Sequence, residues 1–297
     1  MQLTTPNLAQ LRVGFSLAFQ GAFDEIKPQY TALATVVKSS AKSERYGWLG
    51  KMPSVREWIG DRVVQNLAEH DYTILNKDFE VTVAVDRNDI ADDTLGIYGP
   101  MFTDLGQQTA RHPDSLVFAL LAAGFATECF DGQFFFDTDH PVLGENGAEV
   151  SVSNHGGGSG TPWFLLNTSR ALKPIIYQER APFKFVALDK ETDANVFNKK
   201  QFIYGSDGRC NVGYGFWQQA YGSKQTLNAA NYAAARSAMM SLKADHGKPL
   251  GIVPNLLVVP PSLEGAANKL LKNMLASGGE TNEWAGTAEV LVAPLLA

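Results

Sequence analysis

A stripe of aromatic residues near the start of the chain constrains the fold more than any other feature. Phe15, Phe19 and Phe23 follow one another at four-residue intervals in a segment, residues 1–38, that is almost free of charge over its first 23 residues. This spacing places the three rings on one face of an α-helix. A helix at the start of a chain cannot bury such a stripe against itself, so it must lie on the body of the protein or on another molecule.

A second aromatic feature lies between residues 39 and 78. After a polar hinge at residues 39–43, Trp48 and Trp58 stand among charged residues, glycines and a proline. This pattern is typical of an extended, glycine-broken excursion. The neighbouring cations complete the residue types that are enriched at binding hot spots, and they are Lys51, Arg56 and Arg62. We therefore expect the excursion to contact a partner; the alternative is that the tryptophans fold back onto their own domain.

Two regular elements follow the excursion. Residues 79–86 alternate apolar and mostly polar side chains, which predicts a strand with one buried face. Residues 100–126 carry an apolar stripe at helical spacing, interrupted by Pro113. Because proline removes one helical hydrogen bond, we expect two helices or one kinked helix here.

The middle of the chain is richer in glycine and aromatic residues. Residues 137–161 are polar and glycine-rich, which predicts a loop. Aromatic and β-branched residues predict strands at 183–186 and 201–204. Gly205-Ser206-Asp207-Gly208 directly after the second strand predicts a hairpin turn.

The last 70 residues alternate helix and strand patterns. Asn228 is a suitable cap for a helix that would end at Gly247, and residues 255–259 form a short apolar strand. A second amphipathic helix begins after Ser262. Together these elements predict a small α/β lobe with a sheet between helices.

Composition excludes several classes of protein. The chain of 297 residues has a net charge of −6 and no run of Lys or Arg, so it lacks the basic surface of a nucleic-acid-binding protein. Its longest stretch without strongly polar residues, residues 116–126, is about half of the ~20 residues that span a bilayer. We expect no secretory leader, no membrane span, and two reduced, buried cysteines, Cys129 and Cys210.

Two strings suggest chemistry. His155-Gly156-Gly157-Gly158 matches the oxyanion loop of some esterases, but the G-x-S-x-G elbow that should accompany it is missing. Asp137, Asp139 and His140 stand within four residues and could begin a metal site, although Pro141 favours an extended turn that needs no metal. The alternative function is thus an intracellular hydrolase or metal-dependent enzyme that uses these residues.

Linear catalytic and cofactor motifs are otherwise missing. The sequence has no Walker phosphate loop, no G-x-G-x-x-G after a strand, no H-E-x-x-H and no C-x-x-C. We therefore expect no catalytic residue, no bound cofactor and no metal. The sequence favours a protein that functions by making contacts.

Several longer strings resemble one family, the major head subunit of Mu-like phages and prophages. The matching runs are Tyr46-Gly47-Trp48-Leu49-Gly50, residues 56–62, residues 85–90 with Asp92-Asp93, His112-Pro113-Asp114 and residues 131–141. The resemblance covers nearly the whole chain and is strongest from about residue 40 to 141. Residues 228–271 also look like the axial lobe of tailed-phage capsid proteins.

The resemblance implies an α+β chain with the capsid fold first described for phage Hong Kong 97. The implied parts are an N-terminal arm (1–38), an extended loop (39–78), a peripheral domain (79–225) with a spine helix at about 100–125, and an axial domain (226–297).

The same resemblance implies a role in the virion. Such a subunit assembles in the host bacterial cytoplasm into pentamers and hexamers of an icosahedral head shell, which encloses double-stranded DNA without reading its sequence. Portal, scaffold and decoration proteins are the further partners implied. The expected inter-subunit contacts are Phe15, Phe19, Phe23, Trp48, Lys51, Arg56, Trp58 and Arg62. An encapsulin-like compartment, with the same fold around a protein cargo, is the closest alternative.

Overall fold

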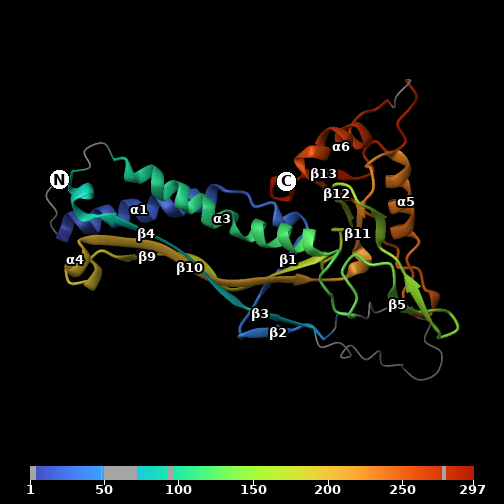
Figure 1. Cartoon of the computed structure of the whole chain (residues 1–297), viewed down its shortest axis with the longest axis horizontal. Helices are drawn as coiled ribbons and strands as arrows, with labels where there is room; N and C mark the ends of the chain where they lie inside the picture. Colours follow the sequence, from blue (N-terminus) through green and yellow to red (C-terminus); the bar gives the residue numbers. More distant parts are fainter. Residues whose placement is uncertain (1–4, 48, 50–71, 93–95, 276–278) are drawn as a thin grey trace.

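The computed structural model describes residues 5–47, 49, 72–92, 96–275 and 279–297. The expected contact residues Trp48, Lys51, Arg56, Trp58 and Arg62 lie outside the described residues. Figure 1 shows two lobes: an elongated lobe, with the start of the first helix at its far tip, and a compact lobe at the other end. The C-terminus lies near the junction of the lobes.

Both lobes contain helices and strands. The helices of the described residues are α1 (Thr5–Glu25), α2 (Arg87–Asp92), α3 (Tyr98–Ala123), α4 (Ala194–Lys199), α5 (Ala229–Met240) and α6 (Glu264–Leu271). The strands are β1 (Ala34–Lys38), β2 (Ser43–Arg45), β3 (Thr73–Leu75), β4 (Lys77–Asp86), β5 (His140–Leu143), β6 (Glu149–Val152), β7 (His155–Gly158), β8 (Trp163–Leu166), β9 (Ile175–Leu188), β10 (Gln201–Tyr214), β11 (Ala220–Lys224), β12 (Leu256–Val259) and β13 (Glu289–Val292).

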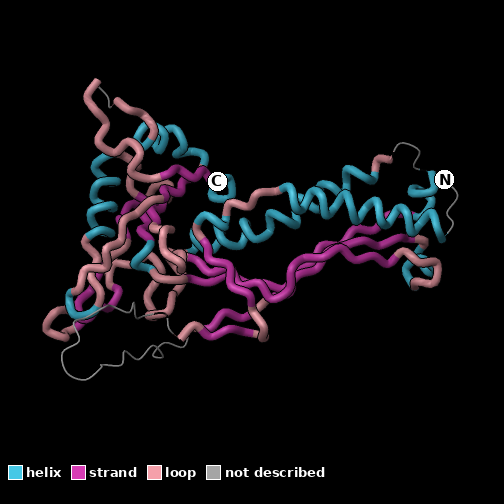
Figure 2. The backbone as a smooth tube through the Cα atoms, turned by 180° about the vertical axis from the view of Figure 1, so that it is seen from behind, coloured by secondary structure: helices cyan, strands magenta, loops and turns pink. Residues whose placement is uncertain are grey.

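The elongated lobe is a four-stranded sheet, in the order β1-β9-β10-β4, with α1 and α3 along it (Figures 1 and 2). β9 and β10 form a long antiparallel pair whose register runs from Ile175 opposite Tyr214 to Leu188 opposite Ile203. β4 pairs antiparallel with β10 and confirms the strand predicted from alternation at 79–86. Burial alternates along β4 and the outer half of β9, as in a sheet with one covered face.

The predicted turn at residues 205–208 is wrong, because this stretch lies inside β10. Gly205 is paired on both sides, with Thr82 of β4 and Val186 of β9. A Cβ on Gly205 would stand 2.6 Å from the Val81 carbonyl oxygen, and one on Gly208 would stand 2.9 Å from the Phe183 ring. These glycines are needed for close packing in a sheet. The chain reverses instead through α4, which joins the ends of β9 and β10.

Residues 98–123 form one helix, α3, and not two. Pro113 lies inside it and has no N–H to donate to the Thr109 carbonyl. The Thr109 hydroxyl donates to the Leu105 carbonyl oxygen at 2.8 Å. The buried face of α3 extends over its whole length and includes Phe102, Leu105, Val117, Phe118 and Leu121, so tertiary packing keeps the helix continuous across the proline.

The N-terminal segment packs on its own chain. α1 lies along α3, and Gly106 of α3 permits a very close approach, because a Cβ at this position would collide with the Phe19 carbonyl oxygen. Phe15 stacks on Phe102 with ring centroids 4.2 Å apart. These residues belong to an apolar core at the outer part of the elongated lobe, separate from the main core that continues into the compact lobe.

The compact lobe contains a five-stranded sheet, in the order β13-β12-β8-β11-β7, with α5 and α6 beside it (Figure 1). Every residue of β8 and β12 is buried, as expected for central strands covered on both faces. The Asn228 side chain accepts the Asn231 backbone N–H at 2.9 Å, which confirms the predicted cap of α5. The helix ends at Met240 rather than near Gly247.

One expected loop needs correction, and the sheet of the compact lobe extends across one expected domain boundary. The expected loop at 137–161 contains β5, β6 and β7. The expected division between residues 225 and 226 does not match the sheets either, since β7 and β8 pair with β11 and β12 in the compact lobe. Residues 137–161 read as a loop because the three strands are short and rich in glycine or polar residues.

The chain passes between the lobes in three described segments. The first, residues 124–139, leads from α3 to β5 and is called the connector below. The second leads from β8 back to β9, and the third from β10 to β11. The two lobes are therefore built from interleaved rather than consecutive parts of the sequence.

Candidate assembly surfaces and the buried His140 cluster

The N-terminal aromatic stripe is covered mainly by its own chain. Phe19 is fully buried and Phe15 is 8% exposed. Phe15 also meets the Tyr204 ring edge-on at 5.5 Å, and Phe19 lies 5.5 Å from the Phe185 ring. The expectation that sister copies shield Phe15 and Phe19 is thus corrected, because the sheet and α3 already supply the apolar cover.

Phe23 differs from the other two phenylalanines, since it is only partly buried. It stacks on Phe19 at 6.1 Å and lines a cavity of about 310 Å³ together with Tyr30, Pro113 and Tyr177. Phe23 is therefore the member of the stripe that retains a surface open to another molecule.

The outer face of α1 carries apolar residues that sequence reasoning missed. Leu17 is 68% exposed and Val13 is 55% exposed. They stand one turn apart on the face away from Phe15 and Phe19. The scarcity of charge could have indicated this surface, because Arg12 is the one charged residue of α1 before Asp24. A helix with so few charged residues along most of its length is typical of a buried position.

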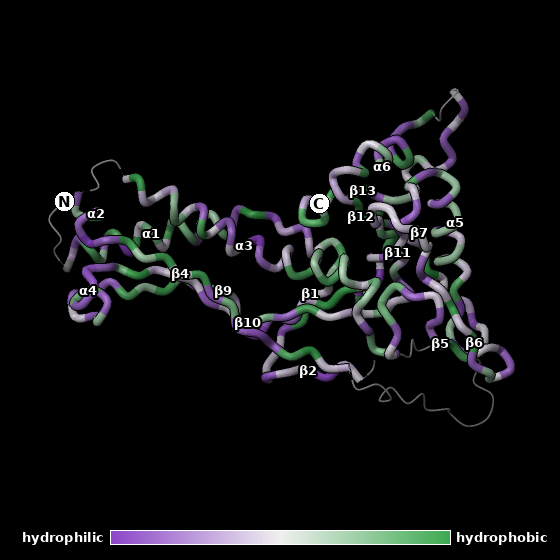
Figure 3. The backbone as a smooth tube through the Cα atoms, viewed as in Figure 1, coloured by the Kyte–Doolittle hydropathy of each residue, from purple (hydrophilic) through white to green (hydrophobic). Residues whose placement is uncertain are grey.

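Further exposed apolar side chains stand at the extremities of the molecule. Phe197 of α4 is 85% exposed, and the neighbouring Leu188 is 52% exposed. Figure 3 shows hydrophilic and hydrophobic stretches side by side at the far tip of the elongated lobe, and Phe197 is the exposed large apolar residue of α4. Met274 and Leu275, which follow α6, are 75% and 61% exposed.

The described ends of the expected extended loop are firmly anchored. β2 and β3 pair antiparallel at its base. The Tyr46 hydroxyl donates to Gln178 Oε1 at 2.7 Å, and Gln178 Nε2 donates to Asn76 Oδ1 at 2.8 Å. Gln178 is fully buried in β9. The excursion therefore begins and ends on a fixed part of the elongated lobe.

Hydrogen bonds to the Glu44 carboxylate close the same base. Its Oε1 accepts from the Ser39 hydroxyl and the Ser40 backbone N–H, both at 2.9 Å. These bonds hold the pKa of Glu44 below its ordinary value. The polar hinge expected at 39–43 is in this way a structured turn.

His140 of the suspected enzyme set lies in a fully buried cluster. Its Nδ1 is 2.7 Å from Asp131 Oδ2 and its Nε2 is 3.2 Å from Asn154 Oδ1. The imidazole stacks parallel to the Trp217 ring, with centroids 3.9 Å apart and planes 9° apart. The Cys129 thiol donates to Asp131 Oδ1 at 3.1 Å.

The other members of the suspected enzyme set have structural roles. The Asp137 carboxylate accepts the backbone N–H groups of Phe134 and Thr138, which is a turn motif. His155 begins strand β7, and its ring lies 5.2 Å from the Phe125 ring. The glycine string after His155 pairs with β11 and is therefore no oxyanion loop. These four residues do not assemble into an open catalytic site.

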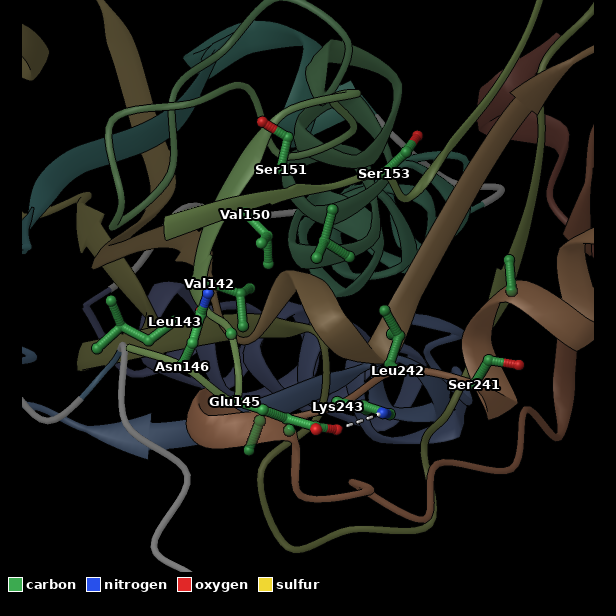
Figure 4. Close-up of a pocket in the computed structure, with 15 residues that line it drawn as sticks. Val142, Leu143, Glu145, Asn146, Val150, Ser151, Ser153, Ser241, Leu242 and Lys243 are labelled. Carbon is green, nitrogen blue, oxygen red and sulfur yellow. Dashed lines mark hydrogen bonds and ion pairs between the residues drawn. The ribbon is translucent and has the colours of Figure 1, made fainter. Parts of the chain in front are cut away.

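One open pocket of about 770 Å³ lies between the β5–β6 hairpin and the end of α5 (Figure 4). Its charged groups pair with each other, since Lys243 Nζ donates to Glu145 Oε1 at 3.1 Å. Serines line part of it, but no histidine or cysteine stands among its lining residues to activate them. The pocket lacks the parts of a nucleophilic site.

Comparison with known proteins covers the whole molecule. The model of the family "Mu-like prophage major head subunit gpT" matches residues 8–296. The chain is similar to the major capsid protein of Escherichia phage Mu, with 42% identity over 305 residues and 100% of both chains covered.

Solved structures of phage capsids show the same similarity as the sequences. A chain of the procapsid of bacteriophage JBD30 superposes with a TM-score of 0.85 at 44% identity, covering 99% of this chain and 100% of that chain. A chain of the JBD30 capsid decorated with minor capsid protein trimers superposes with a TM-score of 0.77 at 34% identity, with 91% of each chain covered.

These similarities confirm the α+β phage-capsid fold and overturn the hydrolase alternative, since the family is structural and not enzymatic. Among the described residues, no helix is long and apolar enough to cross a bilayer. A match across both lobes, from the outer part of α1 to the last residues, leaves one assignment. The chain belongs to the Mu-like prophage major head subunit family.

Proposed function

We propose that this chain is the major capsid subunit of a Mu-like phage head. It assembles into pentamers and hexamers that close into an icosahedral shell around double-stranded DNA, in the host cytoplasm and then in the virion. The observation that carries this proposal is the similarity of the entire chain to head subunits in sequence and in structure. Portal and scaffold proteins are its proposed further partners.

The two-lobed shape suits this role. An elongated lobe with a compact lobe at one end offers different surfaces at its two ends, which suits head-to-tail contacts between copies. Head-to-tail contacts form rings when the rotation between neighbours closes. The exposed apolar residues stand near these extremities, at Phe197 on one tip and at Met274 and Leu275 on the other lobe. A net charge of −6 fits a container that holds DNA without gripping it.

The outer face of α1 is the described surface that we assign to a second copy of this chain. Val13 and Leu17 face solvent in the single subunit, and their face of α1 carries no charge before Asp24. Water is a poor environment for such a face, and a closed shell of copies provides the cover. Trp48, Lys51, Arg56, Trp58 and Arg62 remain predicted inter-subunit contacts, and so does Phe23.

Electron microscopy of the purified protein tests the proposal directly. Shells or rings are expected; a strictly monomeric protein under all assembly conditions would contradict it. Treatment with nuclease separates the encapsulin-like alternative: shells from infected or induced cells should protect double-stranded DNA, whereas protein cargo alone would favour the compartment.

Leu17→Glu tests the α1 surface. The subunit should fold, because Leu17 is largely exposed, but assembly into shells should fall at least tenfold. Leu17→Met is the matched control and should assemble normally, since it keeps an apolar side chain. Normal assembly of Leu17→Glu would refute the α1 contact and leave the shell proposal intact.

Decoration is a further proposal. The JBD30 structure carries trimers of a minor capsid protein, and we propose that this shell also accepts a decorating protein. Co-sedimentation of assembled shells with a minor capsid protein from the same phage tests this. Shells that never retain such a protein would contradict it.

A further inference from the structure

The connector between the lobes ends at a buried hydrogen-bond network whose proton positions can be assigned. The network contains Cys129 and Asp131 of the connector, His140 at the start of β5, and Asn154 just before β7. It therefore fixes the connector to the compact lobe. The assignment starts from Asn154, which is 1% exposed.

The orientation of the Asn154 amide is set by its surroundings. Its Nδ2 donates to the Phe135 carbonyl at 2.8 Å and faces the Trp217 and Ala220 carbonyls at 3.3 and 3.2 Å. Its Oδ1 accepts the Asp137 backbone N–H at 2.9 Å. A flipped amide would place oxygen against three carbonyls and NH₂ against an N–H, so Oδ1 must face His140.

It follows that His140 carries a proton on Nε2, because the oxygen 3.2 Å away can only accept. His140 Nδ1 and Asp131 Oδ2 are 2.7 Å apart, which is a hydrogen-bond distance, so a second proton must lie between these two atoms. Asp131 Oδ1 already accepts from the Gln133 N–H and the Cys129 thiol, both at 3.1 Å. Donors around a carboxyl group favour its ionised form.

We propose that His140 is a buried imidazolium paired with the Asp131 carboxylate. This ion pair holds the connector against the compact lobe. The parallel Trp217 ring, 3.9 Å away, presents its face to this cation. The exposed Asp139 interacts electrostatically with both His140 and Asp137 and adds negative potential. Burial alone would raise the pKa of Asp131, but the hydrogen bonds from His140, Cys129 and Gln133 lower it below its ordinary value.

A proton fits this network better than a metal ion. The donor atoms of Cys129, Asp131 and His140 lie within 4.8 Å of one another. However, each is already engaged in the hydrogen bonds described above. Burial and the Asp131 charge raise the pKa of the Cys129 thiol far above its ordinary value, which disfavours the thiolate that a metal would bind. We therefore treat the three residues as an ion pair with a thiol donor.

Solid-state NMR of assembled shells with ¹⁵N-labelled histidine tests the proposal without any substitution. At neutral pH, one of the five histidines should show two protonated ring nitrogens, and His140→Gln should remove that signal. A neutral ring, with one protonated and one bare nitrogen, would overturn the proposal. A change of the signal on adding zinc or a chelator would also overturn it in favour of a metal site.

Asp131→Asn tests whether the charge depends on the pair. His140 should lose the imidazolium signature, and hydrogen exchange of residues 124–139 should rise at least tenfold while exchange in α5 stays unchanged. Glu128→Gln is the control and should keep both properties, because Glu128 is an exposed carboxylate of the same connector that lies outside the cluster. An imidazolium that persists in Asp131→Asn would refute the pairing; if that variant does not fold, the measurement on the unmodified shell still decides.

Discussion

The Arg12 guanidinium and the Asp189 carboxylate form an ion pair of 3.3 Å between the first half of α1 and the residue that follows β9. Asp189 is 3% exposed in its side chain and Arg12 is 40% exposed. Burial raises the pKa of Asp189 despite the opposing effect of Arg12. This pair joins segments that are 177 residues apart in sequence and ties α1 to the tip of the elongated lobe.

Arg12→Ala should lower the free energy of unfolding by about 1–3 kcal/mol, less than a fully buried pair because Arg12 is partly exposed. The loss arises because Asp189 stays buried without its partner. Urea unfolding of the dissociated subunit measures it. Lys38→Ala breaks the exposed pair with Glu179 and should cost less than about 1 kcal/mol. Equal losses in the two variants would show that the Arg12–Asp189 pair contributes no more to stability than the exposed Lys38–Glu179 pair.

Gly106→Ala should separate α1 from α3. A methyl group at this position meets the Phe19 carbonyl oxygen, and overpacking of this kind costs about 1–3 kcal/mol. Gly99→Ala in the same helix is the control, since a Cβ there meets nothing within 4 Å. It should be neutral or slightly stabilising. Thermal unfolding compares the two, and a neutral Gly106→Ala would contradict the close helix contact.

His112 should make the subunit less stable in acid. Its ring lies 4.4 Å from the Phe79 ring, its Nε2 has no partner, and burial lowers its pKa. The unfolded chain therefore binds this proton more tightly than the folded chain does. The contribution of the neutral His112 ring to the free energy of unfolding is fully present above about pH 6.5 and decreases as the pH drops below that value.

His112→Leu should remove that part of the acid sensitivity. The measurement is the difference in urea midpoint between pH 7.5 and pH 5.5, which should shrink in the variant. His246→Gln, at a position outside the apolar core, should keep the difference of the unmodified protein. An unchanged difference in His112→Leu would assign the acid sensitivity to other groups.

Both cysteines should be unreactive in the folded subunit. Cys129 is 6% exposed and Cys210 is 1% exposed, and burial raises the pKa of each thiol. A thiol reagent such as DTNB should titrate no thiol per chain under native conditions at pH 8 and two after denaturation. Rapid native labelling of either would show that the connector or β10 opens readily.

Local patterns predicted those elements whose environment is reflected in their own sequence. The alternation at 79–86, the Asn228 cap and the apolar run at 255–259 each correspond to an observed element. Gly205 and Gly208 misled for a physical reason. Glycine is common both in turns and where strands approach closely. Only the contacts with Val81 and Phe183 show that these two glycines have the second role.

The buried cluster could not be predicted from spacing. His140 pairs with residues 9 and 14 positions away, and their approach depends on how the connector folds over the compact lobe. The surface of α1 was predicted in part: the segment had to lie against something, but the Phe side turned inward and Leu17 outward. A helix pattern that is apolar on two faces does not indicate which face packs against its own chain and which is left exposed.

Because the described part of the chain passes three times between the lobes, neither lobe is a contiguous piece of the gene. Cutting the backbone in any one passage would leave the halves attached through the other two. Any rearrangement of the lobes must also bend all three of these passages together, so it cannot occur as rotation about a single linker.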